Sequence, residues 1–290
     1  MRSSASDRAV RPYALVLAGG GARGFAHVGV LRGLEAEGLP PSAIVGVSMG
    51  AVVGVTYALN PDWYSALLAV EETDLPVPRL PALGGAWSRS SARPLGILTY
   101  LRTAFRVGSG WGAVSGGLRQ GRKILGELTL NGTLAEGRLP VAVCATDLWT
   151  GRRVTMKSGP AAEAVYASSA MAGLLPPIEH EGGLLVDGAY ADLAPIDVAR
   201  SFGWPVAIAV DVGQDGYGAE IQTGLQAMVR ALDICHRQHA QLRFEQADFV
   251  IRPEFRRPID LFDFSARREC VAGGIRAVRS HGARLKELLG

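Results

Sequence analysis

The stretch IVGVSMGAVVG contains a serine whose neighbours suit nucleophilic chemistry. Ser48 lies between Gly46 and Gly50 in the pattern G-x-S-x-G, after an apolar run and before a helical pattern. In such a strand–turn–helix the serine occupies a sharp, strained turn, and glycines flank it because a Cβ there would collide with the neighbouring chain. The turn raises the hydroxyl above a sheet, at the positive end of the helix. The pattern predicts that Ser48 is a nucleophile.

An earlier glycine cluster, GGGARG, allows two interpretations. Gly19, Gly21 and Gly24 follow an apolar run with the spacing G-x-G-x-x-G, which is typical of dinucleotide-binding loops. Such a site also needs an acidic residue near the end of the second strand. That strand runs directly into Ser48, and the carboxylates before it lie inside the intervening helix. The nucleotide-binding interpretation therefore lacks its second contact.

In the other interpretation this loop receives a developing oxyanion. Open α/β sheets place their active sites at the carboxyl ends of neighbouring strands, where both glycine clusters are expected. Backbone N–H groups around Gly20, Gly21 and Ala22 would then point at a carbonyl oxygen attacked by Ser48. Arg23 either braces this loop, attracts an anionic substrate or is a surface charge near a helix start.

A serine hydroxyl also needs a base. The stretch LLVDGAY places Asp187 at the end of a short apolar strand, followed by Gly188 and Ala189. A carboxylate held at a strand end by a glycine turn has the rigidity of a general base. We expect Asp187 to take the Ser48 proton directly, without a histidine between them.

Histidines provide the alternative base. Only His180, in the loop IEHEGG, is expected to approach the site, where it would complete a triad. His27 is expected to pack or cap in its own helix, and His281 to lie in a basic C-terminal helix. His236 and His239 are spaced as a metal-binding pair, but no third ligand accompanies them. A solvated or half-buried helix face is therefore expected for that pair, and no metal or cofactor.

Strand and helix patterns alternate along the chain and predict the elements that position these groups. Apolar strand-type runs cover residues 13–17, 43–47, 140–146, 152–156, 184–186, 205–212 and 248–251. Helical patterns cover residues 25–38, 49–59, 61–72, 160–171, 195–202, 221–244 and 267–289, with Asn60 as N-cap of the third. Apolar strands separated by helices indicate an α/β fold with a mostly parallel sheet covered on both faces. We expect a disordered leader over residues 1–11 and a single domain over residues 12–290.

One segment does not follow this alternation. Residues 76–117 are rich in Pro, Gly, Ser and Arg and include four aromatic side chains, Trp87, Tyr100, Phe105 and Trp111. Long segments of this type are lids, binding loops or mobile insertions. Arginines beside the aromatics could also rest on lipid headgroups. A lid or mobile insertion with possible peripheral membrane contact is the expectation.

Composition excludes several classes of protein. The formal net charge is +3 and the pI is about 8.9, which suits an anionic phospholipid surface, whereas nucleic-acid binding would need clustered charge. Cys144, Cys235 and Cys270 lie far apart, which argues against a disulfide framework or zinc site and favours reduced, mostly buried thiols. The polar start MRSSASDRAVRPY and the lack of a long apolar run predict neither a secretory signal nor a membrane span. A cytoplasmic location is expected.

Three ordered motifs, GGGARG at 19–24, GVSMG at 46–50 and DGA at 187–189, resemble the patatin-like phospholipase family. The segment YASSAMAGLLPPIEHEGGLLVDGAYADLAPID is similar to the family's region before the aspartate, and the tail ADFVIRPEF…FDF resembles its bacterial members. The resemblance runs from Tyr13 to the C-terminus, apart from 76–117. Two departures concern the pocket wall: Met171-Ala172-Gly173 intervenes before Pro176, and Asp192 stands where asparagine is common.

The resemblance implies a three-layer α/β/α fold with a mostly parallel central sheet and a Ser–Asp dyad that hydrolyses lipid acyl esters. Ser48 would be the nucleophile and Asp187 the general base, with Gly20, Gly21 and Ala22 in the oxyanion loop. Phospholipid or lysophospholipid is the implied substrate, without cofactor. The alternatives are a non-catalytic lipid-binding or regulatory module and a nucleotide-binding oxidoreductase. Chain-length and headgroup preference, the ester position cleaved and the oligomeric state stay open.

Overall fold

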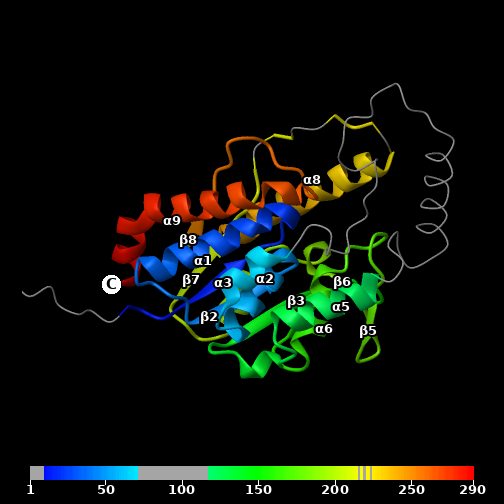
Figure 1. The fold of residues 1–290 in the computed structure, drawn as a ribbon, viewed down its shortest axis with the longest axis horizontal. Coiled ribbons are helices and arrows are strands. Elements are labelled where there is room, and N and C mark those ends of the chain that lie inside the picture. Colours follow the sequence, from blue (N-terminus) through cyan, green and yellow to red (C-terminus); the bar gives the residue numbers. More distant parts are fainter. Residues whose placement is uncertain (1–9, 71–116, 215, 218–219, 223) are drawn as a thin grey trace, which may run out of the picture.

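The computed structural model describes residues 10–70, 117–214, 216–217, 220–222 and 224–290. Their strands form one eight-stranded sheet in the order β5-β6-β3-β2-β1-β7-β8, with β4 also paired to β3 (Figure 1). Pairing is parallel from β3 through β2, β1 and β7 to β8, whereas β4 and β6 run antiparallel to β3 and β5 antiparallel to β6. The strands are β1 Tyr13–Leu17, β2 Ala43–Val47, β3 Val141–Asp147, β4 Arg153–Met156, β5 Ile178–His180, β6 Gly183–Asp187, β7 Val206–Val210 and β8 Phe249–Ile251.

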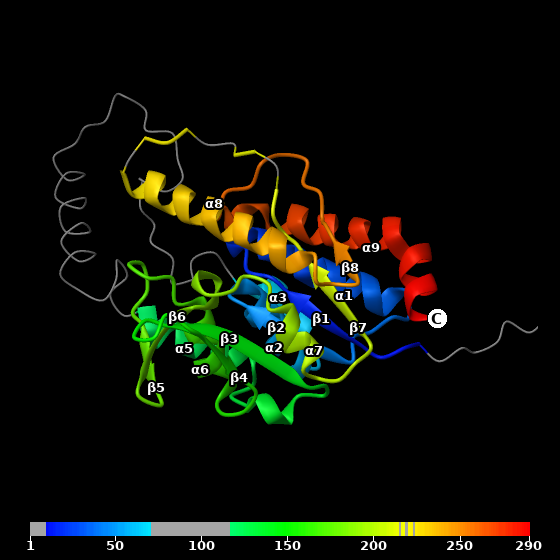
Figure 2. The same ribbon diagram turned by 180° about the vertical axis from the view of Figure 1, so that it is seen from behind.

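Helices cover both faces of this sheet. The α-helices are α1 Ala26–Ala36, α2 Met49–Leu59, α3 Trp63–Ala69, α5 Gly117–Leu128, α6 Ala161–Ser169, α7 Ile196–Arg200, α8 Gly224–Phe244 and α9 Arg267–Leu289. Short 3-10 helices are η1 Gly21–Phe25, η2 Leu134–Glu136, η3 Gly188–Tyr190 and η4 Phe264–Ala266. Figure 1 shows α1, α2 and α9 in front of the sheet, and Figure 2, from behind, shows α7 and α8 in front.

The alternation of side chains along the strands explains the two helical layers. Leu15, Leu17 and Ile44 belong to a buried cluster with α1, α2, α6 and α9. Ala14 and Val16 point the other way, into a second cluster built with α7 and the C-terminal part of α8. Since successive strand residues point to opposite faces, two apolar faces require two covering layers. The expected three-layer α/β/α fold with a mostly parallel central sheet is confirmed.

The pairing of β3 brings two strand ends together. Val47, the last residue of β2, pairs with Cys144. Asp187, the last residue of β6, pairs with Ala145, the next residue of β3. Because β2 runs parallel and β6 antiparallel to β3, their carboxyl ends approach each other from opposite directions. Whatever follows β2 therefore lies beside Asp187.

Most predicted elements are confirmed, several of them to the residue, but the helix expected over 61–72 is shorter. It begins at Trp63 and ends at Ala69. Asn60 does not cap it: its Oδ1 accepts the N–H of Asp62 at 2.9 Å, which forms a turn before the helix. Helix α5 and strand β5 were not predicted. Residues 1–9 of the expected leader over 1–11, and residues 76–116 of the expected insertion, lie outside the described residues.

The cysteines agree with the expectation of mostly buried, reduced thiols. Cys144 and Cys270 are buried and Cys235 is exposed, and all three thiols are free. Among the described helices, none combines the length and apolar character that crossing a membrane requires.

Candidate active site

The turn between β2 and α2 has the strained geometry expected of a nucleophile elbow. Ser48 adopts φ 54° and ψ −125°, in the left-handed region that side chains rarely occupy. A Cβ at Gly50 would lie 2.0 Å from the Leu17 carbonyl oxygen, and one at Gly46 would lie 2.5 Å from Ala51 Cα. Both positions therefore require glycine, because the turn packs directly on β1 and on the first turn of α2.

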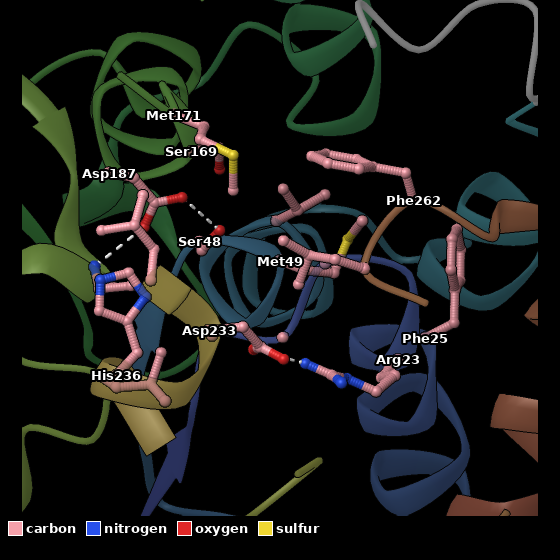
Figure 3. Close-up of a pocket in the computed structure, with 18 of the residues that line it drawn as sticks. Arg23, Phe25, Ser48, Met49, Ser169, Met171, Asp187, Asp233, His236 and Phe262 are labelled. Atoms are coloured by element: carbon pink, nitrogen blue, oxygen red, sulfur yellow. Dashed lines mark hydrogen bonds and ion pairs between the residues drawn. The ribbon is translucent and has the colours of Figure 1, made fainter. Parts of the chain in front are cut away.

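Ser48 and Asp187, the predicted nucleophile and base, are in direct contact. Ser48 Oγ donates a hydrogen bond to Asp187 Oδ2 at 2.7 Å (Figure 3). The other carboxylate oxygen, Oδ1, accepts the N–H of Ala189 at 2.9 Å, which fixes the orientation of the carboxylate. Burial raises the pKa of Asp187 to about 6, and the hydrogen bonds from Ala189 and Ser48 oppose that rise. The carboxylate can accept a proton near neutral pH.

Two further residues hold this arrangement. A Cβ at Gly188 would lie 2.1 Å from the Cys144 carbonyl oxygen, so the turn after Asp187 packs on β3 without room for a side chain. The buried Ser168 hydroxyl accepts the Ser48 N–H at 2.9 Å and donates to the Cys144 carbonyl at 2.6 Å. The backbone of the elbow is thus tied through one side chain to the strand that also positions Asp187.

The glycine-rich loop between β1 and α1 lies beside the serine. A Cβ at Gly19 would be 3.4 Å from Ser48 Cβ. The Gly19 N–H points to the Leu193 carbonyl at 3.4 Å, and the Ala22 N–H donates to the Leu261 carbonyl at 2.8 Å. Among the described residues, the Gly20 and Gly21 amides have no such acceptor. Of the three amides expected to receive an oxyanion, Ala22's is therefore already occupied.

Gly21 and Gly24 shape the loop through steric limits. Gly21 has φ 54°, and a Cβ there would lie 2.3 Å from the Leu261 carbonyl oxygen. A Cβ at Gly24 would lie 2.4 Å from Met49 Cγ, beside the nucleophile elbow. The two glycine clusters thus pack directly on each other, as neighbouring parallel strands require.

Arg23 is a buried ion-pair partner, not a surface charge. It is 2% exposed, and its guanidinium contacts Asp233 of α8 at 2.9 Å (Figure 3). Its Nε atom is buried without a hydrogen-bond partner among the described residues. Arg23 therefore joins the glycine-rich loop to α8, which agrees with the bracing role considered for it.

The histidines do not form a triad with the dyad. His180 is partly exposed beside Glu181 and does not line the pocket around Ser48. His27 is fully buried, and its Nε2 hydrogen-bonds to the Ala18 carbonyl at 2.8 Å, so the expected packing role is confirmed. His236 is the histidine that lines the pocket, where it stacks edge-on against Tyr190 at 5.2 Å. Among the described side chains, no hydrogen bond joins His236 to Ser48 or Asp187.

Sequence reasoning missed the contribution of α8. Asp233 and His236 lie on its inward face with Val229, Leu232 and Ala240, at helical spacing. That spacing is visible in the sequence, but only the tertiary structure shows which cavity the face covers. Among the residues that the structure describes, no third ligand stands beside His236 and His239. In the described part of the chain, no three His, Cys, Asp or Glu residues form a group that could hold a metal ion.

A pocket of about 200 Å³ opens over the dyad, and its walls are mainly apolar. Ser48, Asp187 and the glycines of the loop lie in it together with side chains from α2, α3, α5, α8 and η4. The apolar walls among the described residues include Phe25, Met49, Val52, Leu67, Ile124, Leu125, Leu174, Leu232, Phe262 and Phe264. A hydroxyl and a base at an apolar pocket suit an ester whose acyl part is apolar.

Sequence comparisons agree with this geometry. The family model of the patatin-like phospholipases matches residues 15–200. The chain is 35% identical over 201 residues to the patatin-like phospholipase domain-containing protein ZK370.4 of Caenorhabditis elegans, covering 69% of this chain and 13% of that protein. It is 33% identical over 199 residues to lysophospholipase NTE1 of Cryptococcus neoformans, covering 69% of this chain and 11% of that protein. The chain thus matches only about an eighth of the length of these relatives.

The fold has a solved counterpart. The structure of VipD from Legionella pneumophila superposes with a TM-score of 0.55 at 16% identity, covering 96% of this chain and 67% of that one. At this identity the likeness concerns the fold alone. Because the family model matches residues 15–200, which is more than half of the chain, the chain belongs to the patatin-like phospholipase family.

Proposed function

We propose that this protein is a carboxylic-ester hydrolase that cleaves acyl esters of lipids with a Ser48–Asp187 dyad. The observation that supports it most is the 2.7 Å hydrogen bond from a serine in a strained elbow to a buried carboxylate at an apolar pocket. A structural serine would not need that backbone conformation, which costs about 1–3 kcal/mol.

In the proposed reaction, Ser48 Oγ attacks the ester carbonyl carbon while its proton passes to Asp187 Oδ2. The carbonyl oxygen becomes an oxyanion, which the Gly20 and Gly21 amides stabilise; one such donor contributes about 3 kcal/mol. Collapse of the tetrahedral intermediate breaks the bond to the alcohol, which takes the proton from Asp187. Water, deprotonated by Asp187, then attacks the acyl carbon; the bond to Ser48 Oγ breaks, Asp187 returns the proton to that oxygen, and the fatty acid is released.

Phospholipid or lysophospholipid is the substrate class that we propose. The apolar walls suit an acyl chain, and one relative is named a lysophospholipase. Because the chain matches a small part of those relatives, the activity is proposed for this chain on its own site. The other predictions from the sequence, a single domain with a lid or mobile insertion over 76–117 and peripheral membrane contact, remain proposals too.

The test combines covalent labelling with turnover. A fluorophosphonate probe should label the wild type and fail to label Ser48→Ala, and both Ser48→Ala and Asp187→Asn should lose hydrolysis of p-nitrophenyl acyl esters while staying folded. Near-full turnover by either variant would refute the dyad. An unreactive Ser48 in folded wild type would favour the non-catalytic module, and saturable quenching of NAD(P)H fluorescence would favour the nucleotide-binding alternative.

A further inference from the structure

Helix α8 presents apolar side chains on two opposite faces. Its inward face lines the pocket through Val229, Leu232 and neighbours one helical turn apart. Its outward face carries Met228, Ile234 and Leu242, which are 47%, 42% and 62% exposed. None of these three lines the pocket. A surface helix usually has a polar outer face, so a stripe of three large exposed apolar side chains is unusual and marks a candidate contact surface.

The outward face is also free of negative charge. Ala231, Cys235 and Gln238 are exposed between the three large apolar side chains. From Gly224 to Phe244 the helix contains one carboxylate, Asp233, and that group faces inward to Arg23 at 2.9 Å. Glu220 and Glu245 lie beyond its two ends. The stripe along the middle of α8 therefore offers apolar contact without repelling phosphate groups.

The position of α8 favours a lipid surface as the occupant. The helix lies on the outside of its layer (Figure 2), and its inward residues from Val229 to Phe244 form a wall of the pocket (Figure 3). An apolar outer face on the wall of an acyl-binding pocket would hold the pocket against the layer that supplies acyl chains. A stable contact with a second protein chain usually needs about 20–30 residues on each side, many more than this stripe provides.

We infer that the outward face of α8, formed by Met228, Ala231, Ile234, Cys235, Gln238 and Leu242, docks on the surface of a phospholipid layer. The helix lies in the plane of the interface, with its apolar stripe at the boundary of headgroups and acyl chains. The ion pair from Arg23 to Asp233 then connects the docked helix to the glycine-rich loop beside Ser48. This inference rests on the proposed function for its choice of lipid, but its test does not require turnover.

The binding test uses Ser48→Ala protein, so that no lipid is consumed. Phosphatidylcholine vesicles are sedimented with three proteins. These are the Ser48→Ala parent, the parent with Ile234→Asp and Leu242→Asp added, and a control in which Leu130→Asp is added to the parent instead. Leu130 is a 56% exposed leucine outside α8. Losing two aliphatic side chains that the lipid layer would bury should weaken partitioning at least about tenfold, and the control should bind as the parent does. The neutral pair Ile234→Gln and Leu242→Gln replaces the aspartates if those unfold the chain.

A second measurement uses the active chain. The α8 variants should hydrolyse a monomeric, water-soluble p-nitrophenyl ester at the wild-type rate and phospholipid in vesicles at least about tenfold more slowly. The inference would be overturned if the Ser48→Ala parent did not sediment with the vesicles, or if the α8 variants bound them as tightly as the parent. A wild-type dimer in lipid-free sedimentation that the α8 substitutions dissociate would also overturn it, because the face would then join two copies. Docking by a chain without esterase activity would leave this inference standing and refute the proposed function.

Discussion

Replacing Asp187 by asparagine should stabilise the folded protein at neutral pH while it abolishes hydrolysis. Burial opposes the charged form of this carboxylate and raises its pKa from 3.8 to about 6. At ~1.36 kcal/mol for each pKa unit, keeping Asp187 ionised in the folded state costs about 3 kcal/mol above pH 6. Asparagine has nearly the same shape, can still accept the Ala189 N–H, and carries no charge to bury.

The sign of the pH dependence follows from the direction of that pKa change. With its folded pKa above its unfolded one, Asp187 contributes most favourably to stability below pH 3.8. That contribution is lost as the pH rises through 6. The gap between Asp187→Asn and wild type should therefore be about 3 kcal/mol at pH 7.5 and shrink to under about 1 kcal/mol at pH 4.

Urea unfolding of both proteins at pH 4, 5, 6 and 7.5, followed by tryptophan fluorescence, measures this difference. The wild-type esterase rate provides a check: kcat/KM should fall about tenfold for each pH unit below 6, because the base must be ionised. The reasoning is refuted if Asp187→Asn is less stable than wild type at pH 7.5, or if the stability gap is the same at pH 4 as at pH 7.5.

Three other substitutions test the parts of the site separately. Gly50→Ala should destabilise the fold by about 3 kcal/mol or more in urea unfolding, because its Cβ would lie 2.0 Å from the Leu17 carbonyl oxygen; a change under 1 kcal/mol would contradict the packing of the elbow on β1. Ser168→Ala should cost about 1–3 kcal/mol and lower kcat with little change in KM, because the buried Ser48 N–H and Cys144 carbonyl lose their partner. Ser169→Ala is the matched control for the stability measurement, since the Ser169 hydroxyl has no partner among the described residues. His236→Asn should keep kcat within about threefold of wild type if Asp187 takes the proton directly, whereas a loss near 100-fold would identify His236 as a base.

The meeting of Ser48 and Asp187 was predictable because each position depends on local rules. Gly46 and Gly50 mark an elbow through the steric limits of one turn, and a short apolar run ending in Asp187 marks a strand end. Both signals lie within a few residues of sequence. The geometry of strand ends in α/β sheets then brings them to one edge. The core strands were predictable for the same reason: near-continuous apolar runs have few other uses in a chain of this composition.

What sequence reasoning missed depends on contacts between distant segments. The Ala22 amide looked as available as its neighbours, but the Leu261 carbonyl occupies it. His236 and Asp233 looked like members of an ordinary amphipathic helix until α8 was placed over the pocket. Strand β5 has only three residues, too few for a periodic signal. His180 was the one histidine expected to approach the site, yet it does not line the pocket.

The meeting of two strand ends on β3 separates what must stay constant in this molecule from what is free to vary. The distance between Ser48 and Asp187 follows from the hydrogen-bond ladders of β2 and β6, so a slip of β6 by one residue would turn the carboxylate to the opposite face of the sheet. A large part of the apolar wall comes instead from α3, α5 and α8, none of which belongs to those ladders. Substitutions in these helices can reshape the apolar pocket while the distance between the serine hydroxyl and the carboxylate is preserved. The shape of the pocket and the geometry of the pair can therefore change independently.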